Sequence, residues 1–210
     1  MLEAAAQIEK AEEEKKGDTT KPASDAISVI FCIDISGSMN SGNRLEFCKQ
    51  AVAAQISKMA EDNPNRKIGL VVFDNEIEVI GDGIEKSQTI TNADNMLMDY
   101  AKLLANGQTQ ADERLNKAIG ETKESLLARV AQIHTKGTTA LGPAVLTSVA
   151  MASKGAPGSQ VIVCTDGMAN VGIGSFGRGG DAAATQFYDD VGKFAEDTGV
   201  MINLVTIAGT

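Results

Sequence analysis

The sequence predicts an α/β fold: a doubly wound, mostly parallel central sheet with one antiparallel edge strand and helices on both faces. Continuous apolar runs of the kind found in strands that are buried on both faces support this prediction. These runs alternate with segments whose apolar residues recur every three or four positions, as in helices that cross between parallel strands. The buried runs cover residues 26–34, 67–73 and 160–165, and residues 200–208 are expected to form the last strand.

The predicted helices follow from the same patterns. In residues 44–61, apolar side chains recur at helical spacing, from Leu45 and Cys48 onward. Pro143 stands in the first turn of another helix, where a missing N–H is tolerated. Residues 76–80 alternate polar and apolar side chains, which predicts the antiparallel strand. The helices expected are 44–61, 92–104, 109–134 (with a break near Asn106-Gly107), 141–153 and 181–198.

The chain of 210 residues divides into two parts by composition. Residues 1–24 are highly charged and predict a helix over 2–16 followed by a polar linker. Residues 25–210 form one domain, with a helical insertion at about 87–136. The net charge of −9 argues against nucleic acid and anionic membranes as general partners, since both require a basic surface.

The composition also indicates a cytoplasmic protein that does not insert directly into a membrane. No window approaches the roughly 20 apolar residues of a membrane span, and the N-terminus lacks the apolar core of a signal peptide. Cys32, Cys48 and Cys164 are odd in number and lack metal-site spacing, so we expect buried, reduced thiols. His134 is the only histidine, which leaves a Ser-His-Asp mechanism with a single candidate base.

Polar oxygen-bearing side chains follow the predicted strands. Open α/β sheets place their sites at the carboxyl ends of the strands, so these side chains are expected to meet. The first strand leads into a D-x-S-x-S sequence, the third ends in Thr-Asp-Gly, and a Gly-Thr-Thr segment precedes the helix at 141. The side chains concerned are Asp34, Ser36, Ser38, Thr138, Thr139 and Asp166.

Carboxylates and hydroxyls without an amine or an imidazole suit a hard divalent cation, with Mg²⁺ preferred and Mn²⁺ or Ca²⁺ as alternatives. Two carboxylates only balance the charge of such an ion. The ion therefore stays electrophilic and has room for one more carboxylate from another molecule. This donor set predicts ion-dependent binding rather than catalysis.

The segments Asp34–Met39, Gly137–Thr139 and Val161–Gly167 resemble the three parts of the metal-ion-dependent adhesion site of von Willebrand factor A (vWA) domains, over roughly residues 26–208. The resemblance implies that Ser36 and Ser38 bind the ion directly and that Asp34 acts mainly through water. It further implies a hydroxyl from Thr138, with Thr139 as the alternative, and a second carboxylate from Asp166. The implied partner is a protein that presents Glu or Asp to the ion.

Two departures from the family pattern qualify the resemblance. Residues 81–136 are long for their place, and the chain ends at Thr210 without the family's closing helix. Either the chain is a fragment of a longer protein or another helix covers that face, for which the helix over 2–16 is a candidate. The phrase FCIDISGSM resembles intracellular members: copines, vesicle-coat trunk modules, the vWA part of circularly permuted Ras-like proteins, and chelatase subunits. We therefore expect this domain to work within a larger multidomain protein or complex.

Two other functions compete with metal-dependent binding. One is a structural scaffold whose metal site is a relic or purely structural. The other is a metal-assisted hydrolase, which the absence of a GxxxxGK[ST] phosphate loop disfavours. The glycine-rich loop 167–180 would border the ion, with Phe176 and Arg178 as its partner contacts.

Overall fold

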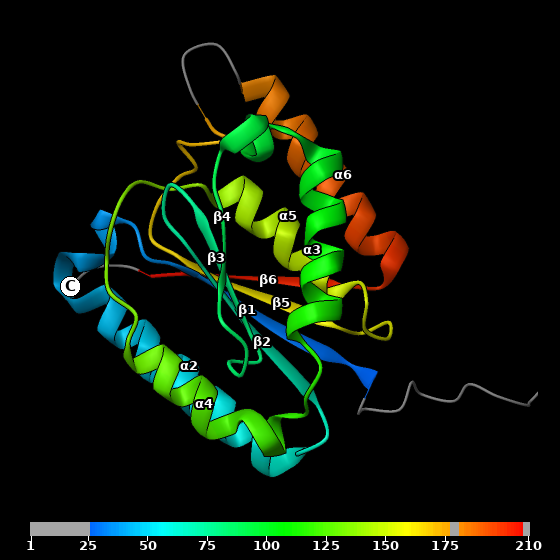
Figure 1. Cartoon of the computed structure of the whole chain (residues 1–210). Helices are drawn as coiled ribbons and strands as arrows, with labels where there is room; N and C mark the ends of the chain where they lie inside the picture. The colour runs from blue at the N-terminus through cyan, green and yellow to red at the C-terminus, as the bar shows by residue number, and fades with distance from the viewer. Residues whose placement is uncertain (1–25, 177–180, 208–210) are drawn as a thin grey trace, which may run out of the picture.

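The computed structural model describes residues 26–176 and 181–207. The predicted helix over 2–16, the linker that follows it and Arg178 lie outside the described residues. Six strands form one sheet in the order β4-β3-β2-β1-β5-β6 (Figure 1). The strands are β1 Ser28–Asp34, β2 Lys67–Phe73, β3 Ile77–Gly81, β4 Gln88–Ile90, β5 Gln160–Thr165 and β6 Met201–Thr206.

The sheet confirms the predicted fold class. β1 pairs in parallel with β2 and β5, and β5 pairs in parallel with β6. β3 is the strand that runs opposite to its neighbours. The short β4 beyond it was not predicted, because its three residues carry no periodic pattern. Because these strands are parallel, the carboxyl ends of β1, β2 and β5 lie together at the same end of the sheet.

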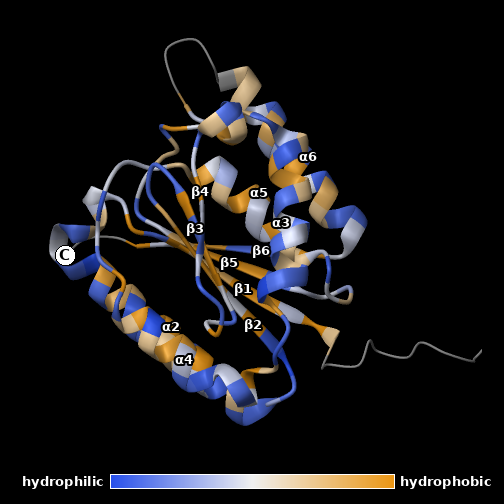
Figure 2. Cartoon of the chain, viewed as in Figure 1, coloured by the Kyte–Doolittle hydropathy of each residue, from blue (hydrophilic) through white to orange (hydrophobic). Residues whose placement is uncertain are grey.

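Helices cover both faces of the sheet. In Figure 1, α2 and α4 lie against one face, whereas α3, α5 and α6 lie on the other. Figure 2 shows the apolar residues gathered in the strands between these two layers. The helices are α2 Arg44–Asp62, α3 Tyr100–Arg114, α4 Ile119–Ala131, α5 Leu141–Ala152 and α6 Asp181–Thr198, with 3-10 segments η2 Gly37–Asn43 and η3 Ala93–Met98.

The most enclosed helix is α5. Every residue from Gly142 to Ala152 is buried, because α5 contacts the sheet on one side and α3 and α6 on the others. Its sequence is accordingly apolar or small all round, as expected of a helix without a solvent face. The loop that carries Thr138 leads directly into this helix.

The predicted helix break at Asn106-Gly107 is wrong. α3 continues through these residues to Arg114, and the chain breaks between α3 and α4 instead. There the carboxylate of Asp82 accepts hydrogen bonds from the backbone N–H groups of Asn116 and Lys117, both at 3.1 Å. A buried carboxylate from a distant turn fixes the interruption, so a local pattern could not reveal it.

Gly107 serves close packing rather than chain reversal. A Cβ at this position would lie 2.6 Å from the carbonyl oxygen of Thr147 and 2.7 Å from the Cβ of Ala150. The missing side chain therefore lets α3 approach α5 closely. Gly107 is itself buried inside the helix.

The edge strand β6 is open to solvent. All six of its residues are exposed, and Leu204 is 63% exposed. No helix within 26–176 and 181–207 is both long and apolar enough to cross a membrane.

We expect Gly107→Ala to lower the free energy of unfolding by roughly 1–3 kcal/mol, because the added methyl group must push α3 away from α5. Urea unfolding measures the effect. Gly192→Ala in the interior of α6 is the matched control, since a Cβ there meets no atom within 4 Å. The control should gain about 0.5–1 kcal/mol through helix propensity. Equal stabilisation of both variants would contradict the packing role of Gly107.

Candidate metal-binding site

Asp34 occupies the end of the central strand β1 and is completely buried. Its Oδ1 accepts a hydrogen bond from the backbone N–H of Ser36 at 2.8 Å. Its Oδ2 accepts one from the hydroxyl of Thr165, at the end of the neighbouring strand β5, at 2.5 Å. The carboxylate is therefore held rigidly between the two strand ends.

A chain of hydrogen bonds joins four of the predicted ligands. The hydroxyl oxygens of Ser36 and Ser38 lie 3.1 Å apart. The Ser38 hydroxyl donates to Oδ1 of Asp166 at 2.7 Å. The side chain of Asp166 is only 1% exposed. The D-x-S-x-S turn after β1 and the turn after β5 thus meet, as predicted from their places in the sequence.

The segment that carries Thr138 is tied to the same turn through its backbone. The N–H of Lys136 donates to the carbonyl of Ile35 at 2.7 Å, and the N–H of Gly37 donates to the carbonyl of Gly137 at 3.1 Å. Thr138 is exposed beside this turn, whereas Thr139 is buried. Within the described part of the chain, no hydrogen bond links Thr138 to the other four predicted ligands.

Three neighbouring residues were missed at the sequence level. Arg44, the first residue of α2, donates from Nη1 to Oδ2 of Asp166 at 2.5 Å. Asp74 follows β2 directly and is buried, and its backbone carbonyl accepts from the N–H of Ala140 at 2.6 Å. The side-chain oxygen of Asn170 accepts from the N–H of Thr139 at 2.9 Å. Asp74 could have been found, because it too follows a buried strand. Arg44 offered a signal as well, because a cation at the start of a predicted helix is locally unfavourable. Nothing in the local sequence marks Asn170.

Burial raises the pKa of Asp34, since the charged form loses its hydration. The hydrogen bonds from Ser36 and Thr165 oppose this rise, and the negative charge of Asp166 adds to it. A cation at this place would favour the ionised carboxylate. The three cysteines are free and buried, as predicted, and burial raises the pKa of the Cys32 thiol to about 12.

The donor set fits a small, hard cation. Two ligands on adjacent corners of a Mg²⁺ octahedron lie about 3 Å apart, and the Ser36 and Ser38 hydroxyl oxygens are separated by 3.1 Å. Among the described residues, no group of three or more His, Cys, Asp or Glu could hold a metal ion. An ion here would therefore depend on hydroxyls and water beside the two carboxylates.

Comparisons with known proteins agree with this architecture. Residues 29–126 match the family model described as von Willebrand factor type A domain. The human COPII-coat protein Sec24c aligns with a TM-score of 0.61 and 11% identity, covering 91% of this chain and 27% of that one. A von Willebrand factor type A protein from Catenulispora acidiphila aligns with a TM-score of 0.51 and 16% identity, covering 85% and 38%. The fold is the vWA fold.

A curated protein is similar to this chain over most of its length. Circularly permutated Ras protein 1 of Dictyostelium discoideum is 30% identical over an alignment of 209 residues, and the match covers 87% of this chain. This chain spans 25% of the length of that protein. vWA domains generally mediate protein–protein interactions.

In EDTA, we expect Asp34→Asn to raise the free energy of unfolding at pH 7, because it removes a buried charge. The folded-state pKa of Asp34 lies above its usual value of 3.8, so the folded chain binds this proton more tightly than the unfolded chain. The Asp34 carboxyl therefore contributes its full stabilisation at pH values below its usual pKa. This stabilisation is lost as the pH rises through the folded-state pKa.

Urea unfolding of both proteins in EDTA, from acid to neutral pH, tests this sign. The advantage of Asp34→Asn should be largest at neutral pH and should shrink as the solution is acidified. A variant less stable than the parent at pH 7 would show that the hydrogen bonds of the carboxylate outweigh its desolvation.

Proposed function

We propose that this chain is a divalent-cation-dependent protein-binding module, in which an ion held by Asp34, Ser36, Ser38, Thr138 and Asp166 receives a Glu or Asp of a partner protein. The observation that carries this proposal is the hydrogen-bonded chain from Asp34 through both serines to Asp166. Two carboxylates and two hydroxyls from separate segments therefore lie together at the carboxyl ends of β1 and β5.

The ion that fits this set best is Mg²⁺, with Mn²⁺ or Ca²⁺ as alternatives. Neutral hydroxyls leave the charge of the ion balanced by only two carboxylates, so it keeps affinity for a further anionic oxygen. When bound, the ion would supply a Lewis-acidic position for that oxygen. Ser36 and Ser38 would orient it, and buried Asp34 would fix the turn that carries them.

Apolar side chains near the site suit contact with a protein surface. Met168, two residues after Asp166, is 67% exposed. Phe176 stacks on Tyr188 of α6, with ring centroids 6.0 Å apart, and keeps part of its ring exposed. The backbone of the intervening loop is held to Thr139 by the N–H groups of Asn170 and Val171. Exposed apolar groups beside a charged centre are typical of interaction surfaces.

We further propose that the domain works in the cytoplasm within a larger protein or complex. The curated relative is much longer than this chain, and one structural neighbour is a coat protein. Three free thiols suit a reducing compartment. We favour binding over catalysis because Asp34 and Asp166, the candidate general bases of this site, would be engaged with the ion.

A calorimetric titration of Mg²⁺ and Mn²⁺ into EDTA-stripped protein tests the proposal. We expect one saturable site that Asp34→Ala abolishes and that Ser36→Ala or Thr138→Ala weakens about tenfold or more, since each removes an ion ligand. Thr135→Ala, which removes a hydroxyl from the same loop outside the ligand set, is the control. All variants should keep the far-ultraviolet circular dichroism of the parent.

The same variants separate the competing functions. A partner captured only with metal, and lost with Asp34→Ala, would support the binding module. Partner binding that survives Asp34→Ala while stability falls would favour a structural scaffold. Mg²⁺-dependent nucleotide turnover that Asp34→Ala abolishes would favour a hydrolase.

A further inference from the structure

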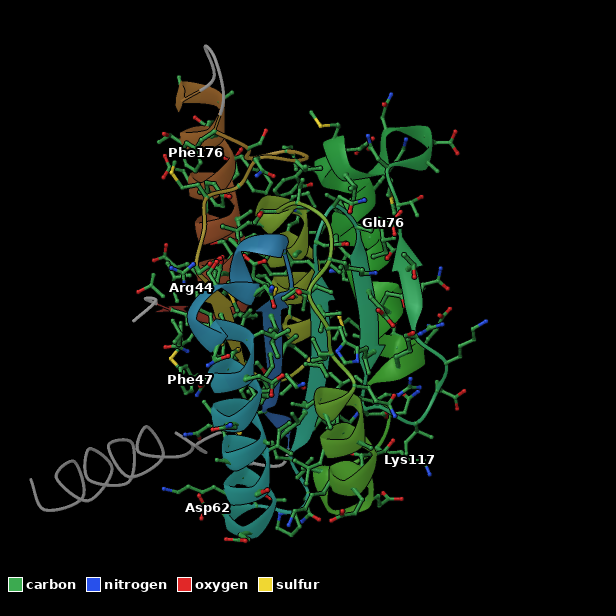
Figure 3. The ribbon with its side chains drawn as sticks, turned by 90° about the vertical axis from the view of Figure 1, so that its left-hand side faces the viewer. Arg44, Phe47, Asp62, Glu76, Lys117 and Phe176 are labelled. Carbon is green, nitrogen blue, oxygen red and sulfur yellow. The ribbon has the colours of Figure 1, made fainter. Side chains whose placement is uncertain are left out.

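Arg44 stands where a cation is locally unfavourable. It is the first residue of the 19-residue helix α2, whose positive dipole end repels a guanidinium. Figure 3 shows Arg44 at the upper end of α2, with Phe47 below it and Asp62 at the far end of the helix. A residue that breaks a local rule needs a compensating role, and such positions are often functional.

The surroundings of the guanidinium are only partly satisfied. Nη1 donates to Oδ2 of Asp166 at 2.5 Å and, more weakly, to the carbonyl of Ser38 at 3.4 Å. Nε is buried and has no hydrogen-bond partner within the described residues. The Arg44 side chain is 25% exposed, so solvent or a ligand can reach part of the group. The guanidinium therefore holds Asp166 and still has donor capacity.

Both oxygens of Asp166 are engaged in this arrangement. The Ser38 hydroxyl donates to Oδ1 and Arg44 donates to Oδ2. An ion that draws on the charge of Asp166 must compete with Arg44 for it. A bound divalent ion would balance the negative charges of the two carboxylates. The positive charge of Arg44 would then be in excess at the site.

We propose that Arg44 couples the ion to the acidic ligand: it neutralises Asp166 while the ion is absent and offers its guanidinium to the carboxylate of the ligand once the ion is bound. This inference rests on the proposed metal-dependent binding function. Arg44 thereby weakens the binding of the bare ion and strengthens the binding of an anion to the loaded site. A planar guanidinium suits this role, because its fork can hold a carboxylate with two parallel hydrogen bonds.

The test titrates Mn²⁺ alone into EDTA-stripped parent, Arg44→Gln and Lys58→Gln. Lys58→Gln removes the same charge from the same helix, about 20 Å further along its axis, where the side chain is exposed. Arg44→Gln should bind Mn²⁺ roughly five- to tenfold more tightly than the parent. Lys58→Gln should stay within about twofold, because salt screens a charge at that distance.

A second arm repeats each titration with acetate as a carboxylate probe, against chloride at equal ionic strength. Acetate should tighten Mn²⁺ binding in the parent and do so less in Arg44→Gln. Arg44→Lys keeps the charge without the fork, so its Mn²⁺ affinity should match the parent while the acetate effect falls. If Arg44→Gln does not fold, Arg44→Lys alone decides.

The outcomes distinguish the two proposals. A parent that binds no Mn²⁺ would overturn the proposed function and this inference with it. A parent that binds Mn²⁺, beside an Arg44→Gln variant with unchanged or weaker affinity, would overturn only the role of Arg44. An acetate effect that Arg44→Lys leaves unchanged would do the same. A purely structural arginine would not shift ion and acetate binding in opposite directions.

Discussion

The whole candidate site depends on one buried carboxylate. Asp34 terminates β1, the strand that lies between β2 and β5, and the end of that strand is closed to solvent. Hydrogen bonds from Ser36 and Thr165 hold the carboxylate but do not fully replace its lost hydration, and its pKa is raised as a result. The centre of the candidate site is therefore a buried carboxylate whose lost hydration is only partly replaced. A divalent cation of the kind proposed above would balance its charge, and Arg44 at the start of α2 forms an ion pair with the neighbouring Asp166.

Much of this arrangement could be predicted because it follows from strand order. Asp34 and Asp166 each lie just beyond a buried apolar run, and parallel pairing of β1 with β5 brings the two ends together. Arg44 escaped prediction because its contact with Asp166 spans 122 positions, although the start of its helix was predicted. Asp74 directly follows β2 and could have been identified, but the Asp74-Asn75 sequence is also typical of an ordinary turn.

Elements outside the sheet were harder to predict because distant contacts override local signals. The Asn106-Gly107 pair has the composition of a break, yet the close approach of α5 uses that glycine inside a continuous helix. The real interruption depends on Asp82, which reaches across from the end of β3 to the backbone at residues 116 and 117. Local propensity is a weak prior wherever packing or a buried polar group decides the outcome.

The complete enclosure of α5 has a consequence for how the domain moves. Its backbone amides have no route to solvent short of a large opening, so their hydrogen exchange should report global unfolding. The loop before it, in which Thr138 is exposed, should instead exchange through small local openings. Because α5 packs against α3, α6 and the sheet, a displacement of this loop that moved α5 would have to move these neighbours with it. The burial of this one helix thus ties the loop that carries Thr138 to the core of the domain.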